Sequence, residues 1–499
     1  MVIEPAQLLR NSTLDCIPPR VARPRYDRSL TRPALAHIGV GGFNRSHLCV
    51  YLDDLLSSGA SELWGEFGIG LLPPDKHVHD ALETQDFLYG VLELESNRES
   101  YRLIGSLVGH LFAPETTAGV LRRLSSPDCL IVSLTVTEGG YFLEDGTGRF
   151  LSEHPDVQHD LAHPDSPRTW LGFVAEAAQR RIQLGHAPFT LLSCDNVQSN
   201  GATARKALLA FADERGADMR RWIESNVTFP NSMVDRITPK TTEAHRELVA
   251  RKFGVHDLSP VVCESFRQWV LEDEFASGRP AWELAGAQIT TNVAPYEEIK
   301  MRLLNGGHSS IGYLADLLGY SYISEALGDP LLKQLLIEFM AEVRQTLEQL
   351  PGIDLDSYSA TIVKRFSNPA IRDQVSRICS NGCAKIARFI LPSLEALLKA
   401  SIRPRMIPLV LACWLHYAAI RDRETPSTLD DPAIESLRPF LASGGSDARS
   451  ALSAPTVFGG LAITYPQIVR TVQHNLDQFR SRGARATIAE ALHGNLHAD

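Results

Sequence analysis

Residues 37–47 read HIGVGGFNRSH and join two segments of different character. The run from Ala34 to Val40 is short and apolar, as expected of a buried strand. The run that follows keeps helical spacing in its apolar residues, which are Leu48, Tyr51, Leu52, Leu55 and Leu56. A strand, a glycine turn and a helix in this order predict one βα unit of a parallel sheet.

The glycines of this turn, at positions 39, 41 and 42, suit a bound dinucleotide. They let the backbone approach a pyrophosphate, and the helix start supplies unpaired N–H groups and a positive dipole end. Arg45 could add a charged contact to phosphate. Asn44 stands where the G-x-G-x-x-G pattern has its third glycine, so a simple glycine turn is the alternative. The expected cofactor-binding residues are Ile38, Gly39, Val40, Gly41, Gly42, Phe43, Asn44 and Arg45.

Asp75 follows a second expected strand, which reads FGIGLL. A carboxylate there could accept both ribose hydroxyls of NAD and repel the extra phosphate of NADP. The alternative is a turn residue after Pro73 and Pro74, since Asp75 lies 36 residues after Gly39, farther than usual.

The 499 residues, 44% of them hydrophobic, suffice for two or three domains of about 150 residues each. The expected strands are Ala34 to Val40, Phe67 to Leu72, Phe87 to Glu93, Cys129 to Val136, Phe189 to Cys194 and Pro260 to Glu264. One later helical stripe comprises Leu331, Leu332, Leu335, Leu336, Phe339, Met340, Val343 and Leu347. We therefore predict an α/β domain at residues 1–293 and a mainly α-helical domain at 294–499, with a ligand site near their junction.

The charge pattern argues against several classes of partner. The formal charge is −10, from 49 basic and 59 acidic residues without a basic run, which disfavours nucleic acid. The N-terminal segment has no signal-like apolar core, which predicts a cytoplasmic protein. The most apolar stretch, Met406 to Ile420, is short for a membrane span and predicts a buried helix. The eight cysteines form no CxxC pair and are expected to be reduced, without a metal site.

Residues 300–308 read KMRLLNGGH and bring three polar side chains within two helical turns. At about 100° per residue, Lys300 lies within roughly 140° of Asn305 and of His308, so one pocket could hold all three. A lysine becomes a base near neutral pH when burial or positive neighbours lower its pKa. The alternatives are a solvated lysine, a structural histidine and an asparagine that ends a helix.

Further polar residues suggest a hydroxylated ligand. Asn196 follows an expected strand, at the edge where α/β sheets bind ligands, although Asp-Asn sequences often make Asx turns. Asp235 could bind a substrate hydroxyl, but an ion pair with its neighbour Arg236 is the default interpretation. Arg377 and Lys385 offer donors to oxygen acceptors, and are otherwise surface charges.

Several segments together resemble the polyol-specific long-chain dehydrogenases, the mannitol dehydrogenase family, over nearly the whole chain. These segments are HIGVGGFNRSH, TVTEGGY, SCDNVQSNG, FPNSMVDRITP, RQWVLEDEFASGRPAWE, PYEEIKMRLLNGGH and RFSNPAIRDQVSRICSNGCAK. The resemblance implies a Rossmann-type N-terminal domain and a mainly helical C-terminal domain. It also implies metal-free, NAD-dependent interconversion of D-mannitol and D-fructose.

The same resemblance implies roles for single residues. Lys300 would be the catalytic base, Asn196 and Asn305 would form the oxyanion hole, and His308 would orient the substrate. Asp235, Arg377 and Lys385 would contact the polyol chain, and Glu297 would pass the proton of the base toward solvent.

Some questions of specificity stay open in the sequence. Pro74 replaces a second acidic residue that relatives can carry, so NAD is favoured over NADP but rejection of NADP could be weaker. Within the family, fructuronate reductase and arabinitol or sorbitol dehydrogenases are alternatives. Outside it, the alternative is a nucleotide-binding sensor without catalysis. The resemblance also favours a monomer.

Overall fold

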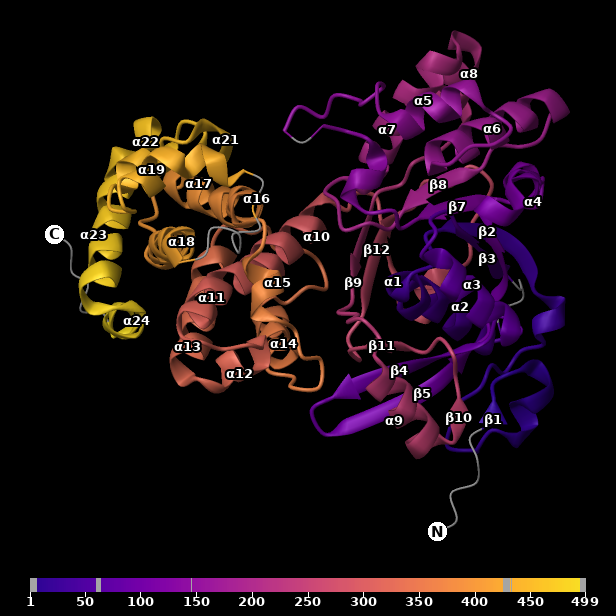
Figure 1. Ribbon diagram of the computed structural model, residues 1–499, viewed down its shortest axis with the longest axis horizontal. Coiled ribbons are helices and arrows are strands. Elements are labelled where there is room, and N and C mark those ends of the chain that lie inside the picture. Colours follow the sequence, from indigo (N-terminus) through magenta and orange to yellow (C-terminus); the bar gives the residue numbers. More distant parts are fainter. Residues whose placement is uncertain (1–6, 60–63, 145, 425–430, 432, 494–499) are drawn as a thin grey trace. The chain divides into compact units, whose positions relative to one another are not determined.

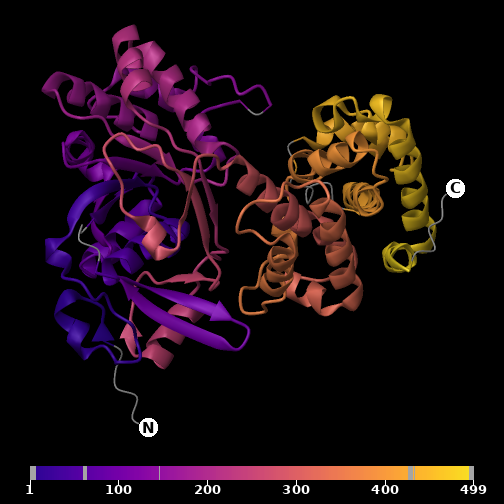
Figure 2. The ribbon, with the colours of Figure 1, turned by 180° about the vertical axis from the view of Figure 1, so that it is seen from behind.

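The computed structural model describes residues 7–59, 64–144, 146–424, 431 and 433–493 (Figures 1 and 2). The chain divides into two compact units, Met1–Ala294 and Pro295–Asp499. All of the named strands belong to the first unit, whereas the described part of the second is built from helices. The predicted α/β fold class, with a mainly helical C-terminal region, is therefore confirmed.

The first unit is built on a five-stranded sheet in which every neighbouring pair is parallel. Its strands, in spatial order, are β6 (Leu107–Phe112), β3 (Trp64–Gly70), β2 (Arg32–Ile38), β7 (Ile131–Leu134) and β8 (Thr190–Ser193). The chain builds outward from β2 through β3 to β6, then returns to the other side of β2 with β7. The strand order therefore reverses between β2 and β7, which is where such sheets bind ligands.

Helices cover both faces of this sheet because its strands are apolar on both sides. Ala36 and Val132 belong to a core with α4 (Ala113–Ser125), α6 (Trp170–Leu184) and α7 (Asn200–Arg215). Leu35 and Ile131 belong to another core with α2 (Leu48–Ser57). The other helices of the unit are α1 (Gly42–Ser46), α3 (Asp75–Thr84), α5 (Pro155–Ala162), α8 (Ala217–Asn226) and α9 (Glu243–Phe253). The arrangement is a doubly wound, Rossmann-type fold.

Two of the expected strands, at Phe87 to Glu93 and Pro260 to Glu264, form but lie outside the main sheet. They are β4 (Tyr89–Glu95) and β11 (Val261–Cys263), which pair with each other in a three-stranded sheet completed by β5 (Arg98–Ile104). A second small sheet contains β13 (Gln288–Thr290), β12 (Gln268–Glu272) and β9 (Ser232–Asp235), and a pair is formed by β1 (Gln7–Leu8) and β10 (Val255–His256). Short apolar runs predict strands but not the sheet to which they belong.

The second unit packs its helices around α18 (Met406–Glu424), most of whose residues are buried. This confirms the predicted core helix. The predicted stripe at residues 331–347 faces the same core from α13 (Pro330–Arg344), with Leu331 at its edge and Leu347 just beyond the helix. Within the described ranges, no helix combines the length and the apolarity that crossing a bilayer requires.

The other α-helices of this unit are α10 (Ala294–Ile299), α11 (Gly306–Leu317), α12 (Ile323–Gly328), α14 (Leu355–Phe366), α15 (Val375–Cys379), α16 (Gly382–Lys385), α17 (Leu391–Lys399), α19 (Arg438–Ala442), α20 (Ala448–Leu452), α21 (Pro455–Phe458), α22 (Leu461–Thr464), α23 (Pro466–Arg482) and α24 (Ala484–Leu492). Two π-helices are η5 (Lys300–Asn305) and η6 (Ile386–Ile390). The 3₁₀-helices in the described ranges are η1 (Asn11–Cys16), η2 (Arg28–Leu30), η3 (Glu138–Tyr141), η4 (Trp282–Ala285) and η8 (Ile434–Leu437).

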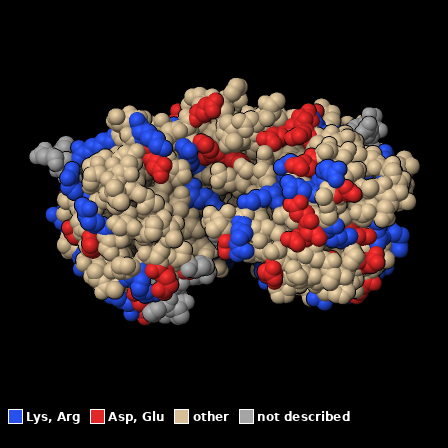
Figure 3. All heavy atoms as spheres, turned by 90° about the horizontal axis from the view of Figure 1, so that it is seen from above, with Lys and Arg blue, Asp and Glu red and all other residues tan. Residues whose placement is uncertain are grey.

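Charged side chains of both signs are interspersed on the face drawn in Figure 3, much of which carries neither. All eight cysteines are free thiols, and Cys16 is the exposed one among them. The prediction of reduced, mostly buried thiols is therefore confirmed.

Candidate functional site

The glycine turn leaves β2 beside the end of β7, at the reversal point of the sheet. Gly39 has a φ of +98°, and a Cβ atom there would lie 2.2 Å from the carbonyl oxygen of Thr135. The Thr135 hydroxyl donates to the Gly39 carbonyl over 2.7 Å. Gly39 is therefore required both by its backbone conformation and by contact with the neighbouring strand. The expected single helix after the turn is two helices, α1 and α2, separated by a kink at His47.

Asn44, which replaces the third glycine, connects the turn to the neighbouring strand β3. It is fully buried, and its amide donates to Glu66 Oε1 over 2.9 Å. The thiol of Cys49 lies 3.2 Å from the same oxygen. Burial raises the pKa of Glu66 to about 7. The side chain of Asn44 is thus engaged inside the protein, and its contact with a cofactor stays a prediction.

Arg45 is likewise directed into the protein. It is 6% exposed, and its guanidinium donates to the carbonyl and hydroxyl oxygens of Ser259 over 2.7 and 2.8 Å. Its Nε also approaches the Gly41 carbonyl oxygen at 3.3 Å. These bonds anchor the glycine turn, and the phosphate contact of Arg45 stays a prediction.

Asp75 lies at the first residue of α3, after the end of β3. Its carboxylate accepts a hydrogen bond from the backbone N–H of Leu72 over 2.8 Å. This is the turn role that the sequence offered as the alternative. The bond uses Oδ2, and the ribose contact stays a prediction.

Asp195 links the end of β8 to the loop that follows β7. Its carboxylate accepts hydrogen bonds from the N–H groups of Val136 and Thr137 at 3.1 and 2.9 Å, and from the hydroxyl of Tyr141 at 2.6 Å. Thr137 has a φ of +65°, so these bonds hold a strained backbone. The carboxylate of Asp195 therefore bonds across to a neighbouring loop. The position of Asp195, directly before Asn196, was its only signal in the sequence.

Asn196 is exposed directly after Asp195, and Asp235 is the last residue of β9. Asn200 connects the two elements: its amide donates to the carbonyls of Asp195 and Ser232, and it accepts from the Ser232 N–H. The first unit thus holds the predicted ligand residues Asn196 and Asp235 on segments that are tied to each other.

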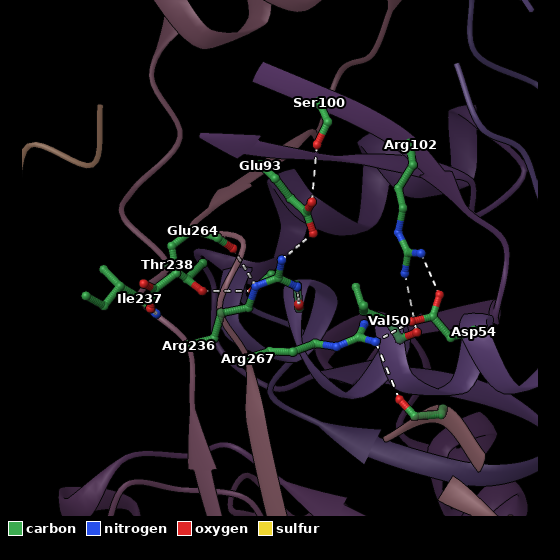
Figure 4. A network of polar contacts seen from close by, with 12 residues as sticks. Val50, Asp54, Glu93, Ser100, Arg102, Arg236, Ile237, Thr238, Glu264 and Arg267 are labelled. Carbon is green, nitrogen blue, oxygen red and sulfur yellow. Dashed lines mark hydrogen bonds and ion pairs between the residues drawn. The ribbon is translucent and has the colours of Figure 1, made fainter. Parts of the chain in front are cut away.

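The ion pair expected between Asp235 and Arg236 is wrong. The guanidinium of Arg236 pairs with Glu93 at 2.5 Å and also donates to the carbonyls of Glu264 and Ser46 (Figure 4). The arginine joins β9, β4 and α1.

In the second unit, Lys300 and Asn305 are the first and last residues of the π-helix η5. The prediction assumed α-helical rotation, which is wrong here. A π-helix bonds residue i to residue i+5, so Asn305 lies one wide turn after Lys300 and on the same side. Lys300 is 6% exposed, and Glu297, on α10, is 7% exposed. Such π-turns often occur at functional sites.

The glycines after Asn305 continue the helix into α11 and do not end it. A Cβ at Gly306 would lie 3.2 Å from the carbonyl oxygen of Phe389 in η6, and one at Gly307 would lie 3.0 Å from Leu336. The two glycines therefore allow close packing of α11 against η6 and α13. The alternative of a helix end at Asn305 is wrong.

His308, on α11, lies within the second unit near Arg377 and Lys385, two further predicted residues. Its ring stacks on Phe366 with centroids 3.7 Å apart. Its Nε2 lies 3.5 Å from the carboxylate of Asp373, which also binds the guanidinium of Arg377 at 2.6 to 2.9 Å. Burial lowers the pKa of His308 well below its usual range, and Arg377 acts in the same direction. The imidazole is therefore neutral near pH 7.

Lys385 reaches the carboxyl end of α15. Its ammonium donates to the carbonyls of Arg377 and Ile378 over 3.1 and 2.9 Å, where the helix dipole favours a cation. Burial lowers the pKa of Lys385, followed by the charge of Arg377. The second unit thus brings His308, Arg377 and Lys385 around Asp373, and it carries Lys300 and Asn305 on the helical turn that precedes His308. Asp373 was not predicted, because only its spacing of four from Arg377 hints at an ion pair.

No group of three or more His, Cys, Asp or Glu residues suited to a metal occurs in the parts of the chain that the structure describes. Within the second unit, a buried lysine is a group that can transfer protons, and the amide of Asn305 is a donor to an oxygen atom.

A parallel sheet with a glycine turn at its reversal point, followed by a helical unit with a buried lysine, defines a Rossmann-type protein of the dehydrogenase kind. Two family models match the chain, the mannitol dehydrogenase Rossmann domain over residues 33–284 and the mannitol dehydrogenase C-terminal domain over residues 292–480. The chain belongs to the mannitol dehydrogenase family.

Individual relatives resemble the chain over almost its full length. A mannitol 2-dehydrogenase of Phaeosphaeria nodorum is 41% identical over 493 residues, 98% of this chain and 86% of the relative. The Pseudomonas fluorescens mannitol 2-dehydrogenase in ternary complex with NAD and D-mannitol is 40% identical, with a TM-score of 0.84 and coverage of 98% and 100%. A D-sorbitol dehydrogenase in substrate-free form is 34% identical, with a TM-score of 0.88 and coverage of 97% and 100%.

Proposed function

We propose that this chain is an NAD-dependent polyol dehydrogenase that interconverts D-mannitol and D-fructose by metal-free hydride transfer. The observation that carries the proposal is the full-length similarity to a structure that holds NAD and D-mannitol. The buried Lys300 and the cluster around Asp373 supply the side chains that such a reaction needs.

The glycine turn fits a dinucleotide. A Cβ at Gly41 would have the Gly39 carbonyl oxygen, 3.9 Å away, as its nearest neighbour. A pyrophosphate could therefore approach the backbone closely at this glycine. Residues 38–45 and Asp75 would hold the cofactor, and Asp75 would favour NAD over NADP. When bound, NAD supplies the hydride acceptor.

Lys300 acts on the substrate hydroxyl as the general base. Its amine takes the hydroxyl proton during oxidation, and its ammonium returns that proton to the carbonyl oxygen during reduction. The amides of Asn196 and Asn305 donate hydrogen bonds to the oxygen, which carries negative charge in the transition state. Glu297 passes the proton of Lys300 toward solvent.

The remaining residues orient the polyol chain. His308, neutral as described, donates or accepts one hydrogen bond at a substrate hydroxyl without adding charge. Asp235, Arg377 and Lys385 bind the other hydroxyls. We further propose that the protein acts as a cytoplasmic monomer whose partners are small molecules, neither nucleic acid nor membrane.

The test is NADH formation at pH 9 to 10 with mannitol, arabinitol and sorbitol, and NADH consumption with fructose and fructuronate. We expect a mannitol-dependent signal that falls by about 10²- to 10⁴-fold in Lys300→Ala. Fructuronate reduction alone would identify a hexuronate reductase. The absence of turnover with every substrate would contradict the proposed function and favour a nucleotide-binding sensor.

A further inference from the structure

The carboxylate of Asp373 contacts two side chains that are predicted to act on the substrate, those of Arg377 and His308. Both of its oxygens accept hydrogen bonds from the guanidinium of Arg377, and Oδ2 faces His308 Nε2. The side chain of Asp373 is 11% exposed, whereas that of Arg377 is 62% exposed. The carboxylate therefore lies beneath a guanidinium that remains accessible to a ligand.

The charges around this carboxylate decide what the guanidinium can bind. Arg377 and Lys385 are cations, His308 is neutral, and Arg365 adds a further positive charge that acts on the imidazole. Asp373 neutralises one of these cations with a bidentate pair, the geometry that a guanidinium otherwise offers to a carboxylate ligand. Without Asp373, the guanidinium of Arg377 could offer the same bidentate pair to a substrate carboxylate.

We propose that Asp373 determines substrate charge, because it occupies the guanidinium of Arg377 and so selects neutral polyols and ketoses over substrates with a terminal carboxylate. This inference rests on the proposed function, which places Arg377 and Lys385 against the substrate chain. A substrate carboxylate would have to displace Asp373 from Arg377 or lie beside it as a like charge. A hydroxyl group needs neither, because it can share the remaining N–H donors of the guanidinium.

A purely structural role for Asp373 makes a different prediction. Its backbone carbonyl accepts a hydrogen bond from the Ile323 N–H over 2.9 Å, and its side chain lies beside α11. If Asp373 only stabilised this packing, its replacement would lower activity on neutral and acidic substrates alike. Selection by charge predicts that the two activities change in opposite directions.

The experiment compares reduction of D-fructose and D-fructuronate by NADH, because these ketoses differ by a carboxylate in place of a terminal hydroxymethyl group. In Asp373→Asn, which keeps shape but removes charge, the ratio of kcat/KM for fructuronate to that for fructose should rise by about ten- to a hundredfold. Asp373→Glu keeps the charge and should leave the ratio close to that of the wild type. The double variant D373N/R377Q should lose the gain.

A matched control is Asp316→Asn. Asp316 also pairs with an arginine, Arg421, and lies on the same helix as His308, two turns farther on. This variant loses an ion pair of the same type, and its ratio should not change.

The outcomes separate the inference from the proposed function. If the wild type fails to reduce fructose, the proposed function is wrong. If the wild type reduces fructose and folded Asp373→Asn, verified by its melting temperature, shows an unchanged ratio, the inference is overturned. If Asp373→Asn does not fold, D-gluconate inhibition of mannitol oxidation by the wild type and Arg377→Gln replaces it. Equal inhibition supports an occupied guanidinium, and much weaker inhibition of Arg377→Gln overturns the inference.

Discussion

The two regions that hold the candidate site residues use carboxylates in different ways. At the glycine turn, Glu66 and Asp195 accept hydrogen bonds from amides and backbone N–H groups, which fixes the path of the main chain. In the helical unit, Asp373 instead binds the guanidinium of Arg377 and so neutralises its charge. The same carboxylate faces the neutral imidazole of His308. The first arrangement fixes the path of the backbone, and the second neutralises a cation at the candidate substrate site.

The largest effect on stability is expected for Gly39→Ala, in the glycine turn. The new Cβ would meet the Thr135 carbonyl oxygen at 2.2 Å in a residue with φ of +98°. We expect a loss of about 3 kcal/mol or more in the free energy of unfolding. Urea unfolding measures this loss.

Gly41→Ala is the matched control, because its Cβ has no neighbour closer than 3.9 Å. It should keep its stability within about 1 kcal/mol while it weakens NAD binding. Equal stability of the two variants would show that the contact with Thr135 does not constrain the turn.

The next effect is expected for Asp195→Ala, which leaves two backbone N–H groups without their acceptor and leaves the Tyr141 hydroxyl with Ser193 Oγ as its remaining partner. The free energy of unfolding should fall by about 2 to 4 kcal/mol. The KM for NAD should also rise, because the loop at the reversal point of the sheet is no longer held. Tyr141→Phe removes one of the three donors and should cost about 1 kcal/mol. A loss in Asp195→Ala no larger than in Tyr141→Phe would contradict this role.

Glu66 predicts a pH-dependent contribution to stability. Its pKa in the folded protein is about 7, above the ordinary value of 4.5, so the folded state keeps a proton that the unfolded chain releases. The stability that this group contributes is full below pH 4.5 and is lost as the pH rises toward 7, by on the order of 3 kcal/mol. Glu66→Gln does not titrate, so the stability of the variant relative to the wild type should increase from pH 5 to pH 8. Urea unfolding at both values checks this, and a constant difference would mean that Glu66 does not change its charge in this range.

The smallest effect is expected for Asp75→Ala. Loss of the bond to the Leu72 N–H should cost about 1 kcal/mol at the start of α3. If the carboxylate also faces the ribose, the ratio of kcat/KM for NADP to that for NAD should rise several-fold. An unchanged ratio would leave Asp75 with its turn role alone.

The same contrast explains what the sequence could predict. The glycines of the turn stand at fixed spacing between an apolar run and an amphipathic run, and this pattern is visible in the sequence. The turn, the first strands and the α/β class were therefore predictable. The π-helix at residues 300–305 was not, because apolar periodicity does not distinguish i+5 from i+4 bonding over a single turn.

Long-range polar contacts were also hidden in the sequence. Arg236 pairs with Glu93, which is 143 residues away, and Asp195 bonds to a loop 58 residues earlier. Local spacing suggested the neighbour Asp235 for the arginine and pointed to no partner for Asp195. The roles of Lys300, Asn305 and His308 were inferred from the resemblance of their motif to a known family, and they stay predictions.

Proton transfer by Lys300 is tested most directly by mannitol oxidation with the Lys300→Ala variant at pH 9 in increasing concentrations of methylamine, a small amine that can take the place of the lost side chain. The account predicts a variant slower than the wild type by about 10²- to 10⁴-fold, whose kcat/KM rises in proportion to the free amine. A variant within about tenfold of the wild type and indifferent to methylamine would show that another group is the base.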